Sequence, residues 1–152
     1  PPLVAEAMEC LGGNGYVEAG PLARIYREVP VNSIWEGSGN IMALDVVRVL
    51  RREPELAHRL LAEAGSASAA LKAQRDRIAT LLQDGANIES NARALCEGLA
   101  VLAAAALLER DAPAPVAQGF LSARLPGDPG GKYGAARIGD VRAVIERALP
   151  AT

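Results

Sequence analysis

The sequence has little of several residue types that particular protein classes need. Only 3% of its 152 residues are aromatic, and it contains two cysteines and one histidine. Alanine and leucine are abundant instead, with 30 and 19 residues, and both favour helices over sheets. With 50% hydrophobic and 22% charged residues, the chain can bury a core. The composition predicts a globular all-α protein and argues against an all-β fold or a disordered chain.

The scarcity of cysteine and histidine limits the possible chemistry. Cys10 and Cys96 lie far apart and neither has a second cysteine nearby, which argues against a disulfide scaffold and a CxxC site. We interpret Cys96 as core packing and His58 as a solvated helix residue, and we predict no metal site. A reducing, cytoplasmic location fits this composition.

Long apolar runs and excess charge are also missing. The longest uncharged apolar run, 98–108, is much shorter than the about 20 residues of a membrane span, so it predicts a buried helix and no membrane partner. Sixteen basic and 18 acidic residues give a net charge of −2, and hence no general attraction to nucleic acid. One local cluster remains, formed by Arg48, Arg51, Arg52 and Arg59. Positions 48, 52 and 59 are expected on one helical face, which leaves weak DNA binding as an alternative to a solvated, paired surface.

Apolar spacing, together with the glycines and prolines, predicts the order of elements. A first helix is expected to end near Leu11, and no regular element is expected over the glycine-dense residues 12–16. Pro30 predicts a break followed by an extended stretch to Trp35. Arg24 and Arg27 are interpreted as ion-pair residues of their helix. Further helices are predicted at about 22–28, 41–52, 54–64, 67–84, 88–110, 116–124 and 138–149.

One segment has the residue types of an anion site. Glu36 stands directly before a predicted helix whose first turn would contain Gly37, Ser38, Gly39 and Asn40. Small residues allow a ligand to approach, and the exposed N–H groups and positive dipole end of a helix start favour phosphate. Serine and asparagine are also ordinary capping residues, so a capped helix with a structural glutamate explains the pattern equally well.

Three motifs in one order resemble a known family. These are the stretches 9–16 (ECLGGNGY), 21–28 (PLARIYRE) and 34–41 (IWEGSGNI), and they closely resemble the C-terminal helical domain of flavin-dependent acyl-CoA dehydrogenases. Glu9, Ser38 and Asn40 stand where the family usually has Gln, Thr and Gln, and these departures resemble most the AidB-like branch, associated with the adaptive response to alkylation damage. The resemblance implies an all-α helical bundle in which 1–52 belongs to that domain and 53–152 forms an additional C-terminal helical region.

The resemblance also implies roles for individual residues. Glu36 would be the general base that removes the α-proton of an acyl-CoA thioester, while hydride passes to the flavin. Gly37, Ser38 and Asn40 would face FAD. Gly12 and Gly13 match a loop that touches the FAD of a neighbouring subunit, which implies a homo-oligomer.

The sequence opens with Pro1 and supplies neither the upstream helical domain nor the β-domain of such enzymes, so we expect a fragment. Two alternatives stay open. One is an AidB-like domain that binds DNA or protects against alkylation, and the other is a non-catalytic remnant of a truncated gene.

Overall fold

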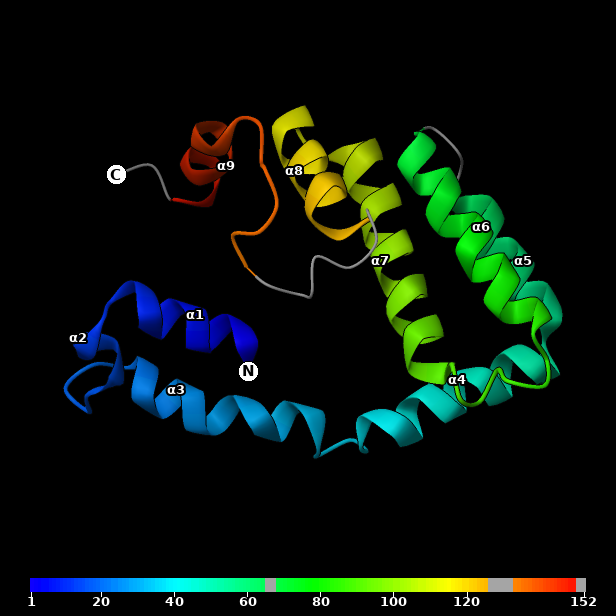
Figure 1. Cartoon of the computed structure of the whole chain (residues 1–152), viewed down its shortest axis with the longest axis horizontal. Coiled ribbons are helices and arrows are strands. Elements are labelled where there is room, and N and C mark those ends of the chain that lie inside the picture. The colour runs from blue at the N-terminus through cyan, green and yellow to red at the C-terminus, as the bar shows by residue number, and fades with distance from the viewer. Residues whose placement is uncertain (65–67, 126–132, 150–152) are drawn as a thin grey trace. The chain divides into compact units, whose positions relative to one another are not determined.

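The computed structural model of the chain describes residues 1–64, 68–125 and 133–149, and every regular element in these ranges is a helix (Figure 1). This confirms the predicted all-α class. The elements are α1 (Pro2–Cys10), α2 (Gly13–Tyr16), α3 (Leu22–Glu28), the 3-10 helix η1 (Val29–Ser33), α4 (Gly39–Arg52), α5 (Pro54–Glu63), α6 (Ala69–Gln83), α7 (Ala92–Asp111), α8 (Ala114–Arg124) and α9 (Val141–Ala148).

Contacts divide the chain into two compact units, an N-terminal unit of residues 1–42 and a C-terminal unit of residues 43–152. Each unit is described by itself. The resemblance implies a different boundary, after residue 52, which separates the part of the chain that resembles the family from the additional C-terminal region. That boundary stays a prediction.

The N-terminal unit is built around the close approach of α1 and α2. Gly15 is buried, and a Cβ added to it would lie 2.3 Å from the carbonyl oxygen of Met8 in α1. Only a residue without a side chain lets the two backbones come this near. Helix α3 packs against both α1 and α2, and Ala23 is its buried residue.

Two predictions for this unit are wrong. Residues 13–16 form the one-turn helix α2, because Gly12 adopts a φ of +57° and redirects the chain before it. Pro30 does not start an extended stretch, since Val29 keeps a helical conformation (φ −55°, ψ −35°) and η1 follows directly. Proline in the first turn of a helix loses only an N–H group that would lack an acceptor there.

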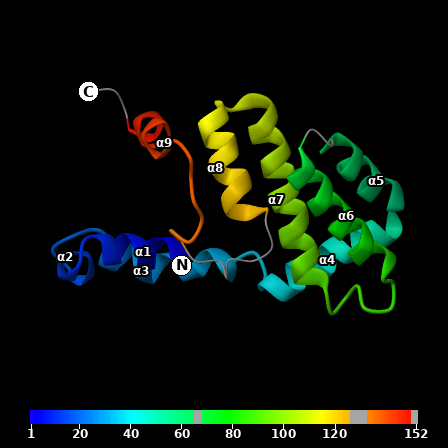
Figure 2. The ribbon, with the colours of Figure 1, turned by 45° about the horizontal axis from the view of Figure 1, so that its top comes forward.

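The C-terminal unit has a continuous apolar core. Helix α7 lies between α6 and α8 in both views of the ribbon (Figures 1 and 2), and it contacts both. The largest fully buried side chains of this core include Leu71 and Ile78 of α6 and Leu95 and Leu102 of α7. Helix α4 adds Ala43, Val47 and Leu50 to the same core. The buried positions of α7 repeat at intervals of three and four residues, as expected for the core face of a helix.

The predicted helix boundaries mostly agree with the structure. Helix α7 begins at Ala92 rather than at residue 88, because residues 85–91 are occupied by turns. There the backbone N–H and the side-chain amide of Asn87 both donate to Asp84 Oδ1. None of the described helices combines the length and apolar character that crossing a membrane requires.

Candidate functional site

Glu36 lies in a short turn between η1 and α4 that backbone hydrogen bonds hold on both sides. The Trp35 N–H donates to the Val31 carbonyl at 3.0 Å, and the Gly37 N–H donates to the Ile34 carbonyl at 3.1 Å. Gly37 has a φ of +125°, a backbone conformation that side chains disfavour, and an added Cβ would lie 3.3 Å from Met42 Sδ. The turn therefore requires glycine directly after the glutamate.

The start of α4 lies two residues beyond the turn. The helix begins at Gly39, so Gly37 and Ser38 precede it and do not form its first turn as predicted. Its first hydrogen bond runs from the Met42 N–H to the Ser38 carbonyl at 3.1 Å. The amides before Met42 in this turn lack an intrahelical acceptor, and they carry the positive end of the helix dipole. This helix start has the chemistry to hold a phosphate oxygen.

The Glu36 carboxylate is exposed, and it has no hydrogen-bond or ion-pair partner in the part of the chain that the structure describes. Ser38 and Asn40 are exposed as well. The alternative of a structural glutamate needs a partner for the carboxylate, and the described residues offer none.

Gly12 and Gly13 lie in the same N-terminal unit, at the start of α2. Gly12 precedes the helix with its positive φ, and Gly13 is the first helical residue. A Cβ added at either position would meet no atom within 4 Å. Their backbone is therefore open to a ligand or to another subunit, in contrast to the buried Gly15.

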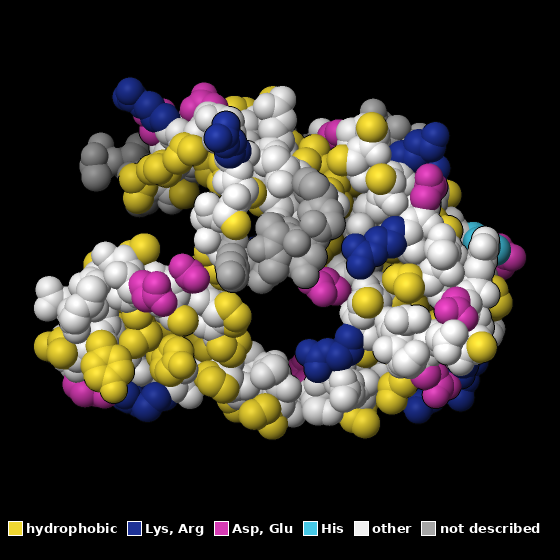
Figure 3. Space-filling model, viewed as in Figure 1, with side chains coloured by type: hydrophobic (Ala, Val, Ile, Leu, Met, Phe, Trp, Pro, Cys, Tyr) yellow, Lys and Arg dark blue, Asp and Glu magenta, His cyan; other side chains and the backbone are white. Residues whose placement is uncertain are grey.

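Much of the surface around these segments is apolar. Figure 3 shows hydrophobic side chains gathered over the N-terminal unit, where Trp35 is 67% exposed and Tyr16 is 77% exposed. The other exposed large hydrophobic side chains of this unit are Leu3, Leu11, Val17, Ile25, Tyr26, Val31, Ile34, Ile41 and Met42. Contiguous apolar surface of this kind marks an interaction site. The sequence analysis missed this surface. A signal was present, because residues 1–42 contain few apolar partners against which these side chains could be buried.

Exposed ion pairs of the N-terminal unit involve both of its arginines. Arg27 makes two hydrogen bonds to the Glu18 carboxylate, at 2.5 and 3.0 Å, and Arg24 bonds Glu28 at 2.9 Å. The hydrogen bond from Arg27 lowers the pKa of Glu18. The interpretation of both arginines as ion-pair residues is confirmed.

Two of the four arginines in the predicted basic cluster are also paired. Arg48 bonds Asp45 one turn earlier on α4. Arg51 bonds Glu89, which lies in the turn before α7, at 2.5 Å. Both pairs are exposed and neutralise half of the cluster.

The remaining two arginines, Arg52 and Arg59, form no ion pair with any residue that the structure describes. They do not share one helical face, because α4 ends at Arg52 and α5 begins anew at Pro54. The expectation of a single basic face over 48, 52 and 59 is therefore wrong.

The cysteines and the histidine have ordinary surroundings. Cys96 packs against the core of the C-terminal unit with its thiol 3.8 Å from the Ala43 carbonyl, and burial raises its pKa, which confirms a packing role. Cys10 is exposed, and both cysteines are free thiols. His58 is exposed on α5, with Nδ1 3.9 Å from Oε2 of Glu55. Within the described ranges no three ligand-type side chains gather to hold a metal ion.

Sequence comparison relates the N-terminal part of the chain to known proteins. Residues 2–51 match the family "Acyl-CoA dehydrogenase, C-terminal domain". "Putative acyl-CoA dehydrogenase AidB" of Escherichia coli (strain K12) is 65% identical over 63 residues, which are 41% of this chain and 12% of that protein. "Acyl-CoA dehydrogenase family member 11" of Caenorhabditis elegans is 48% identical over 48 residues, 32% of this chain and 8% of that protein. The chain thus matches about a tenth of the length of these relatives. The segment 2–51 covers α1 to α3 and nearly all of α4, including Gly12, Gly13 and Glu36, and in this segment the chain matches the C-terminal domain of acyl-CoA dehydrogenases.

Proposed function

We propose that this chain supplies the C-terminal helical part of an FAD-dependent acyl-CoA dehydrogenase, in which Glu36 is the general base. The observation that carries the proposal is an exposed carboxylate without a described partner, fixed by a glycine turn directly before a helix start. A general base needs a carboxylate that is open to substrate and held at a fixed position. The turn meets both requirements, and two free thiols fit the expected cytoplasmic setting.

The residues beside Glu36 fit a flavin dinucleotide. Gly37 leaves the space over Met42 unfilled, and the helix start behind Ser38 offers amides without an intrahelical acceptor. In this proposal Gly37, Ser38 and Asn40 hold FAD, which when bound accepts a hydride from the β-carbon of the substrate. Glu36 itself accepts the α-proton of the acyl-CoA thioester.

The N-terminal unit supplies only part of such a site. Gly12 and Gly13 present open backbone, and in the proposed homo-oligomer they contact the FAD of a neighbouring subunit. The apolar surface that includes Trp35 and Tyr16 is available for these subunit and domain contacts. We therefore expect the 152-residue chain alone to bind FAD weakly and to turn over no substrate.

The test is the substitution Glu36→Gln in a full-length protein that contains this segment. We expect bound flavin to remain while bleaching of its absorbance by an acyl-CoA thioester is lost, because an amide cannot accept the proton. Glu63→Gln, at an exposed glutamate on α5, is the matched control and should bleach normally. Unchanged bleaching in Glu36→Gln would remove Glu36 from this role. Absent bleaching in the unsubstituted protein would favour a non-catalytic remnant.

Nucleic-acid binding is a second candidate, and the observation that favours it is the pair of arginines at the junction of α4 and α5. Arg52 and Arg59 are exposed and form no ion pair with described residues. Two phosphate contacts predict that log K falls with log salt at a slope of about −2. Fluorescence anisotropy of a labelled duplex at two salt concentrations measures this slope. An Arg52→Gln/Arg59→Gln variant should lose the weak binding, whereas tight, salt-resistant binding would place DNA ahead of dehydrogenation.

A further inference from the structure

The C-terminal unit contains a cavity of about 560 Å³. Its walls come from α6, α7 and α8, and residues between Tyr133 and Val144 of α9 also line it. Cavities that bind small molecules have volumes of about 300–1,000 Å³, so this one has room for such a ligand. Its apolar lining includes Ile78, Leu81, Val101 and Phe120.

Two glycines bring the cavity walls close together. A Cβ added to Gly98 of α7 would lie 3.2 Å from Ile78 Cγ1 and 3.3 Å from Gln74 Nε2. A Cβ added to Gly119 of α8 would lie 3.1 Å from Ile138 Cγ2. Both glycines line the cavity, so a side chain at either position would press against the opposite wall.

A buried polar side chain faces this space. Gln74 is 8% exposed and lines the cavity, and its amide nitrogen donates to the Gly98 carbonyl at 3.3 Å. Among the described residues, no side-chain nitrogen or oxygen that is shut off from solvent lacks a partner. The amide oxygen of Gln74 has no partner there, so it must reach open space. A cavity with such an acceptor takes up polar groups, whereas a purely apolar one stays dry.

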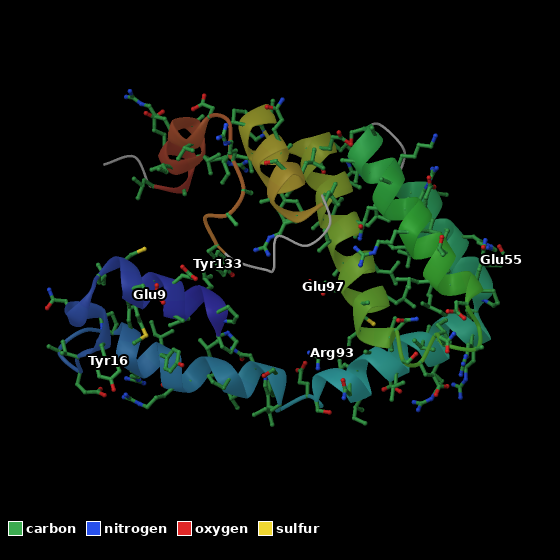
Figure 4. All side chains as sticks on the ribbon, in the orientation of Figure 1. Glu9, Tyr16, Glu55, Arg93, Glu97 and Tyr133 are labelled. Atoms are coloured by element: carbon green, nitrogen blue, oxygen red, sulfur yellow. The ribbon has the colours of Figure 1, made fainter. Side chains whose placement is uncertain are left out.

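The exposed margin of the cavity carries more positive than negative charge. Arg77 of α6 and Arg124 of α8 are both exposed lining residues, and neither forms an ion pair within the described ranges. The Arg124 guanidinium lies 5.6 Å from the centre of the Tyr133 ring. Among the described lining residues there is one carboxylate, Glu97 of α7, and Figure 4 shows Glu97 on α7 and Tyr133 in the segment that precedes α9.

We propose that this cavity binds a small amphipathic carboxylate, whose apolar chain fills the space between α6, α7 and α8. The carboxylate lies at the margin with Arg77 and Arg124, because guanidinium groups pair well with carboxylates. Arg124 is held for this purpose by its stacking on Tyr133. All residues involved belong to the C-terminal unit, so the proposal does not depend on the function of Glu36.

Calorimetric titration of the full chain with sodium decanoate, and separately with decan-1-ol, tests this proposal. We expect one decanoate per chain and at least about fivefold weaker binding of the uncharged alcohol, which corresponds to about 1 kcal/mol of exposed charge pairing. Equal affinities for the two compounds, or no decanoate binding, would overturn it. Many bound decanoates per chain would indicate surface adsorption, which also overturns it.

Charge variants at exposed positions test the location without disturbing the core. Arg77→Gln and Arg124→Gln should each weaken decanoate binding several-fold, whereas Glu97→Gln should strengthen it because a like charge is removed. Lys72→Gln on α6, at an exposed position that does not line the cavity, is the control and should change nothing. Ala123→Leu, at a lining position of α8, should abolish binding by filling the space while circular dichroism shows an intact fold. Binding that survives Ala123→Leu and both arginine variants places the ligand elsewhere and refutes the proposal.

Discussion

The glycine-rich segment before α3 offers a sharp test of which glycine the fold needs. Gly15 and Gly13 are two residues apart in the one-turn helix α2. The test compares two single variants, Gly15→Ala and Gly13→Ala. At Gly15 the new Cβ would lie 2.3 Å from the Met8 carbonyl oxygen and 2.8 Å from its Cα. Both are backbone atoms of α1, so no side-chain rotation can relieve the contact. At Gly13 the new Cβ meets no atom within 4 Å.

The magnitude follows from the packing. Overpacking in a well-packed region costs about 1–3 kcal/mol, and the Gly15→Ala value should lie near the upper limit because α1 itself must move. A loss of about 3 kcal/mol raises the local opening constant by roughly 100-fold. Gly13→Ala should be neutral or stabilise slightly, since alanine is favoured over glycine in helices by about 1 kcal/mol.

Hydrogen–deuterium exchange of peptides from residues 1–33 measures local opening of the N-terminal unit directly. Faster exchange in α1 and α3 is expected for Gly15→Ala only, with peptides of α6 and α7 unchanged as an internal reference. Equal exchange in the two variants would show that the approach of α1 and α2 does not depend on Gly15. The reasoning on the whole glycine motif would then fail.

Two further predictions concern stability and ionisation. Leu102→Ala should lower the free energy of unfolding by about 2–5 kcal/mol in denaturant titration, whereas Leu107→Ala, at a half-exposed position of the same helix, should cost well under half as much. The pKa of Glu18 should rise toward its ordinary value in Arg27→Gln, as followed by NMR titration. Because this pKa is lowered in the folded state, any stabilisation by the pair is present above the ordinary carboxyl pKa and is lost as pH falls through the lowered value.

Much of the helical architecture could be predicted because its signal is local. The spacing of Leu71, Ile78, Leu95 and Leu102 repeats at helical intervals, and these residues are the centre of the core. The errors at 12–16 and 29–33 have one cause. A glycine-dense or proline-containing segment permits several conformations, and neighbouring elements select among them. Here α1 selects the helical turn at Gly15.

The candidate site could be predicted only in part. Glu36 and Gly37 could be singled out from the sequence because the motif and the helix start lie within six residues of each other, and their role stays a prediction. Arg51 and Glu89 are 38 residues apart in sequence, so no local sequence pattern predicts their ion pair. The cavity likewise unites Gln74, Gly98 and Arg124 through the packing of three helices, so its existence follows from tertiary structure alone.

The two units differ in what stabilises them, and this difference separates the two proposed activities. The N-terminal unit buries Gly15 and Ala23 but leaves Trp35 and Tyr16 largely exposed, so its apolar surface is available for contact with further protein. The C-terminal unit has its own core, and its cavity is lined by residues of this unit alone. On the proposed function, we therefore expect the 152-residue chain alone to show no dehydrogenation even when its fold is intact. Decanoate binding, by contrast, requires only the C-terminal unit, and it should persist where flavin binding fails.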